Sequence, residues 1–160
     1  MSNKKFIESI PVGPLAIVAL PGSKALGDKV DAYISGWRSE RLEAKESPIT
    51  FKGYVKDSYL LNVSVPRFGT GEAKCALKDT VRGCDLYIID DVTNHSIEYT
   101  VCGQKNHMSP DDHYADIKRV IAAASGKARK ITVIMPFLYE SRQHRRSSRE
   151  SMDCAVMLQE

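Results

Sequence analysis

Residues 131–149 read Ile131-Thr-Val-Ile-Met-Pro-Phe-Leu-Tyr-Glu-Ser-Arg-Gln-His-Arg-Arg-Ser-Ser-Arg149. The first five residues form a short apolar run of the kind that makes a buried strand. A strand that leads directly into four arginines places a dense positive cluster at one edge of a sheet. In α/β folds, ligands bind at the carboxyl ends of parallel strands, and guanidinium groups match phosphate oxygens. The stretch therefore predicts a phosphate or nucleotide site at a strand end.

Two more apolar runs, at 15–20 and 85–90, predict further buried strands. The first run is followed by a predicted helix with Ser23 as its N-cap. The apolar residues of this helix recur at helical spacing, so one face is expected to pack against the sheet. That expected face consists of Leu26, Val30, Tyr33, Ile34 and Trp37.

A second helix is predicted to begin at Ser109-Pro-Asp-Asp112, where an N-cap serine precedes a proline and an acidic residue. Gly126 is expected to close it. The expected apolar face of this helix consists of Tyr114, Ile117, Val120, Ile121 and Ala124. A third helix is expected to begin at Asp153, and its inward positions would be Ala155, Met157 and Leu158.

The segment between the first helix and the strand at 85–90 predicts an antiparallel flap. The runs at 59–65 and 72–77 are rich in strand formers, and Arg67-Phe-Gly-Thr-Gly71 supplies the turn between them. Residues 38–57 are charged and poorly periodic, and we expect a connection with a short strand near Ile49–Phe51. Residues 91–109 are polar and irregular, which predicts a long loop.

The order of these elements predicts the fold class. Strands that alternate with helices form a parallel sheet that is covered by helices on both faces. We therefore expect an α/β fold in which a mostly parallel sheet forms the middle of three layers. The predicted flap would be an antiparallel β attachment to that sheet.

Length and composition limit the class of protein. A chain of 160 residues, 42% hydrophobic and 27% charged, has the size and composition of one soluble globular domain. No run approaches the roughly 20 apolar residues of a membrane span. A net charge of +3 is too small to predict nucleic-acid binding. The last eight residues resemble an apolar helix without a C-cap, so residues 1–160 are interpreted as one N-terminal domain of a longer, truncated protein.

The cysteines and histidines predict neither disulfides nor a metal site. Cys75, Cys84, Cys102 and Cys154 contain no CxxC pair, and we expect free thiols in a cytoplasmic protein. His95, Cys102, His107 and His113 lie close together in the sequence, but their spacing matches no standard zinc site. These four are interpreted as ordinary loop residues.

Several motifs occur in the order found in ribose-phosphate diphosphokinases, also called PRPP synthetases. Pro136 and Arg142-Gln143 resemble the family's proline and Arg-Gln pair after a strand. Phe68-Gly-Thr-Gly-Glu72 is similar to the Phe, Asp/Asn and Glu pattern of the family's flap. Asp79-Thr-Val-Arg-Gly83, followed by the run at 85–90, is similar to the family's Glu-x-Val-Arg-Gly and the strand after it.

The chain departs from the family's pattern at four places, one of which is the spacing to Arg149, which is one residue short. Thr70 stands where the flap motif has Asp or Asn, and His144 stands where the arginine motif has Asp. The Arg-x-Pro-Ile-Ser segment of the family is replaced by Arg149-Glu-Ser-Met-Asp153.

The resemblance implies a phosphoribosyltransferase-like version of the three-layer fold, with an ATP site and a regulatory phosphate site. In such a site the aromatic ring of the flap stacks on adenine, and the Arg-Gln pair contacts ATP. The ATP-binding residues that it implies are Phe68, Thr70, Glu72, Arg142, Gln143, His144 and Arg145. The regulatory phosphate site would use Thr80, Arg82 and Arg149.

The resemblance also implies an activity for the full-length parent. The family uses ATP and Mg²⁺ to place a pyrophosphoryl group on the C1 hydroxyl of ribose 5-phosphate, which yields PRPP and AMP. We therefore expect a ribose-phosphate diphosphokinase that forms a homo-oligomer through this domain. The isolated 160-residue chain is expected to be inactive, because the family's PRPP-binding loop follows this domain.

Alternatives stay open at this point. The parent could be a non-catalytic regulatory subunit of the same family, as Thr70 and His144 indicate. The arginine run could be a solvated basic loop, or could bind an acidic partner or RNA. Arg82 could pair with an acidic neighbour, Asp79 or Asp85, and Phe68 could be a core residue under the flap.

Overall fold

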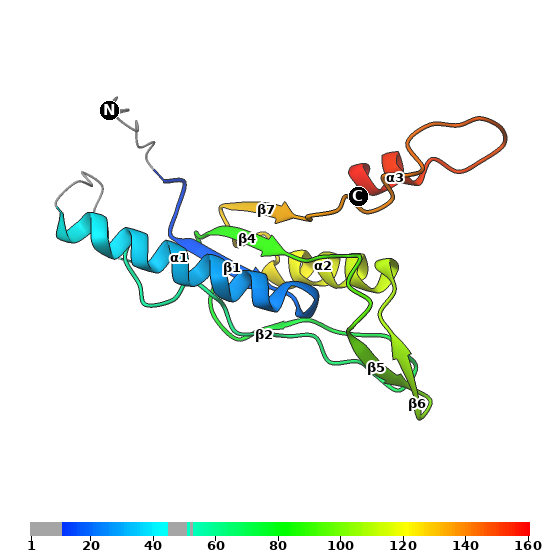
Figure 1. Cartoon of the computed structure of the whole chain (residues 1–160), viewed down its shortest axis with the longest axis horizontal. Helices are drawn as coiled ribbons and strands as arrows, with labels where there is room; N and C mark the ends of the chain where they lie inside the picture. The colour runs from blue at the N-terminus through cyan, green and yellow to red at the C-terminus, as the bar shows by residue number, and fades with distance from the viewer. Residues whose placement is uncertain (1–10, 45–50, 52) are drawn as a thin grey trace.

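The computed structural model describes residues 11–44, 51 and 53–160. At its centre lies a parallel sheet with the strand order β1-β4-β7 (Figure 1). The strands are β1 (Leu15–Ala19), β4 (Asp85–Ile89) and β7 (Lys130–Ile134). A single parallel bridge adds Leu60 to the outer side of β1, opposite Ile17. The three predicted strands and their parallel arrangement are confirmed.

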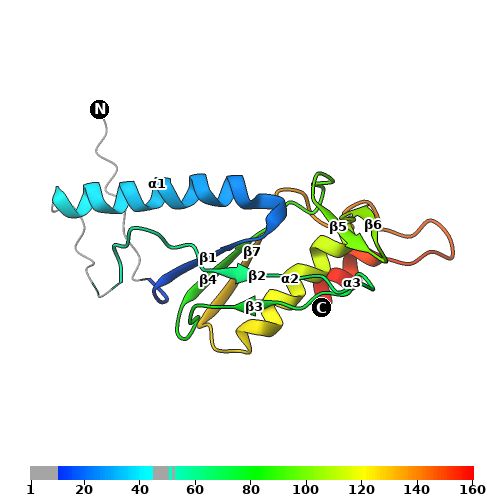
Figure 2. The same ribbon diagram turned by 90° about the horizontal axis from the view of Figure 1, so that it is seen from below.

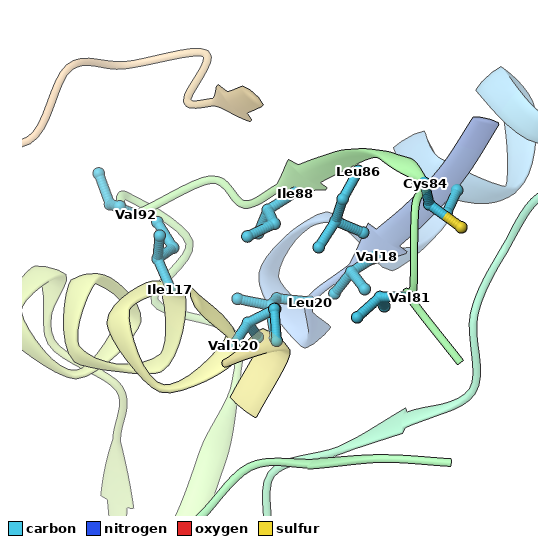
Figure 3. Packing of buried hydrophobic residues seen from close by; sticks show 11 residues of the cluster. Val18, Leu20, Val81, Cys84, Leu86, Ile88, Val92, Ile117 and Val120 are labelled. Atoms are coloured by element: carbon cyan, nitrogen blue, oxygen red, sulfur yellow. The ribbon is translucent and has the colours of Figure 1, made fainter. Parts of the chain in front are cut away.

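Side chains alternate between the two faces of the sheet, and each face carries one long helix. α1 (Lys24–Glu43) covers one face and α2 (Pro110–Ala124) covers the other (Figure 2). The larger cluster lies on the α2 side, where Val18 and Ile88 of the strands meet Val120 of the helix (Figure 3). On the α1 side, Ile17 and Ile89 form a smaller cluster. The predicted three-layer α/β fold is therefore confirmed.

α1 meets the sheet through a different face from the predicted one. Val30 and Ile34 do pack on the sheet. Leu26, Tyr33 and Trp37, however, are 43%, 73% and 48% exposed, so this part of the prediction is wrong. The helix also runs on to Glu43, so the first residues of the connection expected at 38–57 are helical. In the short strand expected near Ile49–Phe51, residues 49 and 50 lie outside the described residues, and Phe51 belongs to no strand.

Two residues that sequence patterns do not reveal decide how α1 is oriented. Gly27 is buried against β1, and a Cβ at this position would overlap the Cβ of Ala19. One turn later, buried Asp31 accepts a hydrogen bond of 2.6 Å from the backbone N–H of Tyr59. Gly27 and Asp31 therefore point towards the sheet, and the aromatic side chains of Tyr33 and Trp37 point outwards.

The ends of α1 and α2 are built differently. Ser23 is the N-cap of α1 and the last residue of the 3-10 turn η1 (Pro21–Ser23), but its hydroxyl makes no capping hydrogen bond. In α2 the predicted start is confirmed, because Ser109 and Asp112 form a reciprocal capping box. The helix ends at Ala124, and its C-cap residue Ser125 adopts a left-handed conformation before Gly126. Ile121 of the predicted apolar face is 38% exposed, and buried His113 and Asp116 take part in that face instead.

Two antiparallel pairs extend from the sheet. The flap is built on β2 (Val63–Ser64) and β3 (Ala76–Leu77), so its ladder is shorter than predicted. The expected irregular loop at 91–109 is wrong in its centre, where β5 (Glu98–Val101) and β6 (Gln104–His107) form a hairpin. Cys102 and Gly103 turn this hairpin with φ values of 49° and 82°, as a tight two-residue turn requires. The alternation that marks a strand is weak there, because β6 is exposed throughout.

In α3 (Asp153–Gln159), Met157 is buried as predicted, but the other predicted inward positions, Ala155 and Leu158, are not. Cys154 and Met157 are buried, whereas Leu158 is 67% exposed. All four cysteines are free, as expected. Among the described residues, no helix is both long enough and apolar enough to cross a membrane.

Two glycines of α1 test how the helix is seated. Gly27→Ala should destabilise the chain by roughly 1–3 kcal/mol, because the added methyl group has no space against Ala19. Gly36→Ala should stabilise it by about 0.5–1 kcal/mol, since nothing lies within 4 Å of a Cβ there and alanine favours the helix. Urea unfolding of both variants measures the difference. If both substitutions change the free energy of unfolding equally and in the same direction, the described packing of Gly27 against β1 is wrong.

Candidate functional site

A hollow of about 350 Å³ opens where β4 and β7 reach their carboxyl ends. Its walls come from three segments: the loop after β4, the start of α2 and the segment after β7. Lining residues include Thr93, His95, Pro110, Tyr139, Glu140 and Arg142. The structure therefore places Arg142 at the sheet edge where the sequence predicts a ligand site.

Two tyrosines fasten the segment after β7 to α2. The rings of Tyr114 and Tyr139 stack with their centroids 4.4 Å apart. The Tyr139 hydroxyl donates a hydrogen bond of 2.7 Å to Asp111. Burial raises the pKa of Tyr139, and the hydrogen bond and charge of Asp111 raise it further, so this hydroxyl stays protonated. The Tyr114 hydroxyl donates to the carbonyl of Met157 at 3.0 Å and so connects α2 to α3 as well.

A buried ion pair holds the loop after β4. The ring of His113 lies with Nδ1 3.0 Å from the Asp90 carboxylate and Nε2 2.9 Å from the carbonyl of Asn94. Both partners are acceptors, so both ring nitrogens donate and the imidazole is charged. Burial lowers the pKa of His113, but the hydrogen bond and charge of Asp90 and the Asn94 carbonyl outweigh it, and the pKa is raised. The prediction that His113 is an ordinary loop residue is wrong.

Gly22, in the turn after β1, packs against the buried pair of Asp90 and His113. Its carbonyl accepts a hydrogen bond of 2.8 Å from the Asn94 side chain. A Cβ on Gly22 would lie 2.6 Å from Oδ1 of Asp90 and 2.8 Å from Cε1 of His113. Only glycine therefore fits beside the buried ion pair, and the turn after β1 is locked to the loop after β4.

The arginine loop extends beyond the sheet into solvent (Figure 1). Gln143 holds its base, because its side-chain amide donates to the carbonyl of Ser151 at 2.9 Å. His144 lies at the surface with Nδ1 3.1 Å from the Ser141 carbonyl. All four arginines are exposed, and none forms an ion pair with any residue that the structure describes: Arg142, Arg145, Arg146 and Arg149.

The tip of the flap lies apart from this hollow, which contains no flap residue. Phe68 and Glu72 close a turn through a 2.7 Å hydrogen bond between the N–H of Phe68 and the carbonyl of Glu72. The Thr70 hydroxyl donates to the Glu72 carboxylate at 3.0 Å. Phe68 is 50% exposed, so the alternative that it is a core residue under the flap is wrong. Its role in binding a base stays a prediction.

The residues of the expected regulatory phosphate site do not meet within one chain. Thr80 and Arg82 precede β4 at the amino end of the sheet, where the Thr80 hydroxyl accepts a 3.3 Å hydrogen bond from the N–H of Arg82. Arg149 lies in the segment between β7 and α3, which follows the carboxyl end of the sheet. Arg82 forms no ion pair with Asp79 or Asp85, so that alternative is also wrong.

A buried charge network under the flap escaped the sequence prediction. Arg67, at the start of the flap turn, lies with Nη2 2.8 Å from the carboxylate of Asp116. Arg119 contacts the other oxygen of Asp116 at 2.5 Å. Burial raises the pKa of Asp116 and the two guanidinium groups lower it, with a raised pKa as the result. The spacing of Asp116 and Arg119 on one helix is a local signal, but Arg67 is 49 residues from Asp116, so no local pattern predicts this pair.

Comparison with known proteins agrees with the motifs. Residues 15–160 match the family model described as the N-terminal domain of ribose phosphate pyrophosphokinase. The chain belongs to this family. The resemblance predicted from the ordered motifs is therefore confirmed.

Two relatives show how much of a family member the chain represents. It is 32% identical over 82 residues to ribose-phosphate pyrophosphokinase 5 of Schizosaccharomyces pombe, a match that covers 51% of this chain and 20% of that protein. The crystal structure of phosphoribosylpyrophosphate synthetase from Mycobacterium smegmatis has a similar fold, with a TM-score of 0.57 and 18% identity. That similarity covers 91% of this chain and 38% of the other. The chain thus spans well under half of either relative.

The buried imidazolium predicts a pH dependence of stability. Because the folded-state pKa of His113 is raised, its stabilising contribution should be complete below the usual histidine value of about 6.5. It should be lost as the pH rises through the folded-state value. Urea unfolding from pH 5.5 to 9 should therefore show wild type losing more stability than His113→Gln as the pH rises. His144→Gln, at an exposed position, should follow wild type. If wild type and His113→Gln change in parallel, the imidazolium assignment is wrong.

Proposed function

We propose that the chain is the ATP-binding N-terminal domain of a longer, cytoplasmic ribose-phosphate diphosphokinase. Such an enzyme transfers the pyrophosphoryl group of ATP to ribose 5-phosphate and so makes PRPP. The arginine loop carries the proposal, because its four guanidinium groups have no acidic partners among the described residues and follow a parallel strand. Like charges this close together are stabilised by a bridging anion, and guanidinium forks fit phosphate oxygens.

The proposed ATP site has two parts, the arginine loop and the flap turn, and their side chains differ in chemistry. Arg142 and Arg145 would bind the phosphates. Gln143 would position these two arginines, because its side chain fastens the base of the loop. His144 is exposed beside them. On the flap, Phe68 offers a half-exposed ring for the adenine. Thr70 and Glu72 would contribute hydrogen bonds at the edge of the base.

Mg²⁺ accompanies ATP in the family reaction. The described residues contain no group of three or more His, Cys, Asp or Glu side chains that could hold a metal ion. Mg²⁺ usually keeps several waters and is bound through substrate phosphates and one or two carboxylates, so it can enter with ATP without such a group. For ATP itself, the arginine loop supplies positive charge that can bind the phosphates.

We further propose that each ATP site is shared between two copies of the protein. The hollow beside Arg142 contains no flap residue, and Phe68 faces solvent. An exposed aromatic ring contributes little to a monomer but can stack on a base held by a neighbour. Thr80 and Arg82 would likewise meet Arg149 of a second copy in the regulatory phosphate site. This arrangement supports a homo-oligomer.

A regulatory, non-catalytic subunit of the same family is the second candidate. Thr70 already directs its hydroxyl to Glu72, and His144 replaces an expected carboxylate. Both changes reduce the polar groups available to a nucleotide. The purified full-length protein separates the two candidates: an enzyme makes PRPP from ATP and ribose 5-phosphate, whereas a regulatory subunit changes only the rate of an active relative. The isolated chain should make none.

The arginine loop should bind nucleotide phosphates. The isolated chain is expected to bind ATP with Kd of about 1 mM, as half of a shared site. Arg142→Gln and Arg145→Gln should each weaken binding about tenfold, because one charge-assisted contact contributes roughly 1.5–3 kcal/mol. NMR titration with ATP measures the Kd of the wild-type chain and of each variant.

The matched control is Arg129→Gln, an exposed arginine just before β7 at the other end of the strand. It should leave ATP affinity unchanged. If all three variants bind like wild type, the arginine loop is not the phosphate site. Tight RNA binding that falls steeply with added salt would favour a nucleic-acid function instead.

A further inference from the structure

The β5–β6 hairpin contacts the tip of the flap directly. The N–H of Cys102, in the hairpin turn, donates a hydrogen bond of 2.9 Å to the carbonyl of Gly69 in the flap turn. A Cβ on Gly71 would lie 3.3 Å from Cγ2 of Val101, so the two turns pack without a gap. The sequence predicts an irregular loop here, and the proposed ATP site includes no residue of the hairpin.

Tyr99 of β5 is the centre of this contact. The guanidinium group of Arg67 lies 4.8 Å above the centroid of its ring. Its hydroxyl donates to the carboxylate of Asp112 at 3.1 Å and accepts from the Asn106 side chain at 2.9 Å. Tyr99 therefore joins the flap, both strands of the hairpin and the first turn of α2.

Arg67 connects the flap to the same helix. Its side chain is 10% exposed, and its guanidinium lies 2.8 Å from Asp116 and 3.7 Å from Asp112. A charge buried to this degree needs its partners, because losing one leaves an uncompensated charge. Arg67 immediately precedes Phe68 in the chain, so the position of the guanidinium group limits the position of the ring.

The flap alone offers little to hold its turn. Its ladder has two residue pairs, Val63 with Leu77 and Ser64 with Ala76, and one isolated bridge from Arg67 to Ala73. A two-stranded hairpin of this kind is at best marginally stable in water. The flap strands pack on the core through Val63, Val65, Cys75 and Leu77, but the turn lies beyond these residues. Tyr99 and Arg67 connect that turn to α2 and so limit its motion.

The hairpin supports the turn without covering it. Beside the contact between the flap and the hairpin opens a hollow of about 810 Å³, lined by Thr70, Glu72, Tyr99, Gln104 and Asn106 among others. The polar side chains of the flap stay accessible from this side. Phe68 is half-exposed.

We propose that the β5–β6 hairpin is a brace that holds the flap in its base-binding conformation, with Tyr99 and Arg67 as positioning residues. The inference rests on the proposed nucleotide function of the flap. A flap held in place before binding loses less conformational entropy when the base arrives. The brace therefore strengthens ATP binding without contacting the reacting atoms, and it acts on KM for ATP rather than on kcat.

Hydrogen exchange tests the mechanical half of the proposal in the full-length protein. Tyr99→Ala should speed exchange of the flap amides at 68–71 about tenfold, because the turn loses its support. Tyr99→Phe keeps the ring under Arg67 and should have a smaller effect. Glu98→Gln removes a surface charge that pairs with Lys105 and His107 of the same hairpin but leaves Tyr99 and its partners in place, so it should exchange like wild type. Unchanged exchange in Tyr99→Ala overturns the brace.

ATP kinetics test the functional half and separate it from the proposed function. Tyr99→Ala should raise KM for ATP about tenfold with kcat within about twofold of wild type, and Phe68→Ala should also raise KM. If Phe68→Ala weakens ATP binding but Tyr99→Ala does not, the brace proposal is overturned while the flap site stands. If neither variant changes ATP binding, the flap is not a nucleotide arm, and the functional half of the proposal fails with it. If the full-length protein has no activity, ATP affinity measured by calorimetry replaces KM.

Discussion

The first two turns of α2 hold together segments that are far apart in the chain. Asp111 receives the Tyr139 hydroxyl from the segment after β7, and Asp112 receives Tyr99 from the hairpin. His113 pairs with Asp90 after β4, and Asp116 binds Arg67 of the flap. One amphipathic helix thus positions the flap, the hairpin, the loop after β4 and the base of the arginine loop. The capping box at Ser109 fixes where this helix begins, and with it the direction of each of these side chains.

Much of this organisation depends on buried charge. Asp90, His113 and Asp116 are at most 2% exposed. Each of these charges has a partner of opposite sign, as burial of charge requires. Such pairs add little net stability compared with apolar packing, but removal of one partner is strongly destabilising. Their value here is geometric, since a carboxylate accepts its partners only from defined directions.

The two parts of the proposed ATP site, the flap turn and the arginine loop, are both connected to α2 but lie apart. The flap turn and the arginine loop are both tied to α2, yet the hollow beside Arg142 includes no flap residue. This separation is what a site assembled from two copies requires.

The sequence by itself determined the three strands of the parallel sheet, the start of α2, the family and the position of the arginine cluster after β7. These depend on apolar periodicity, on capping residues and on ordered motifs, all of which are local. Only the tertiary structure decided which face of α1 is buried, because Gly27 and Asp31 turn inwards for partners on β1 and at Tyr59. It also decided the hairpin at 98–107 and the pairing of Arg67 with Asp116, 49 residues apart. Such pairs form between residues that no spacing rule connects, and the fold must exist before they can meet.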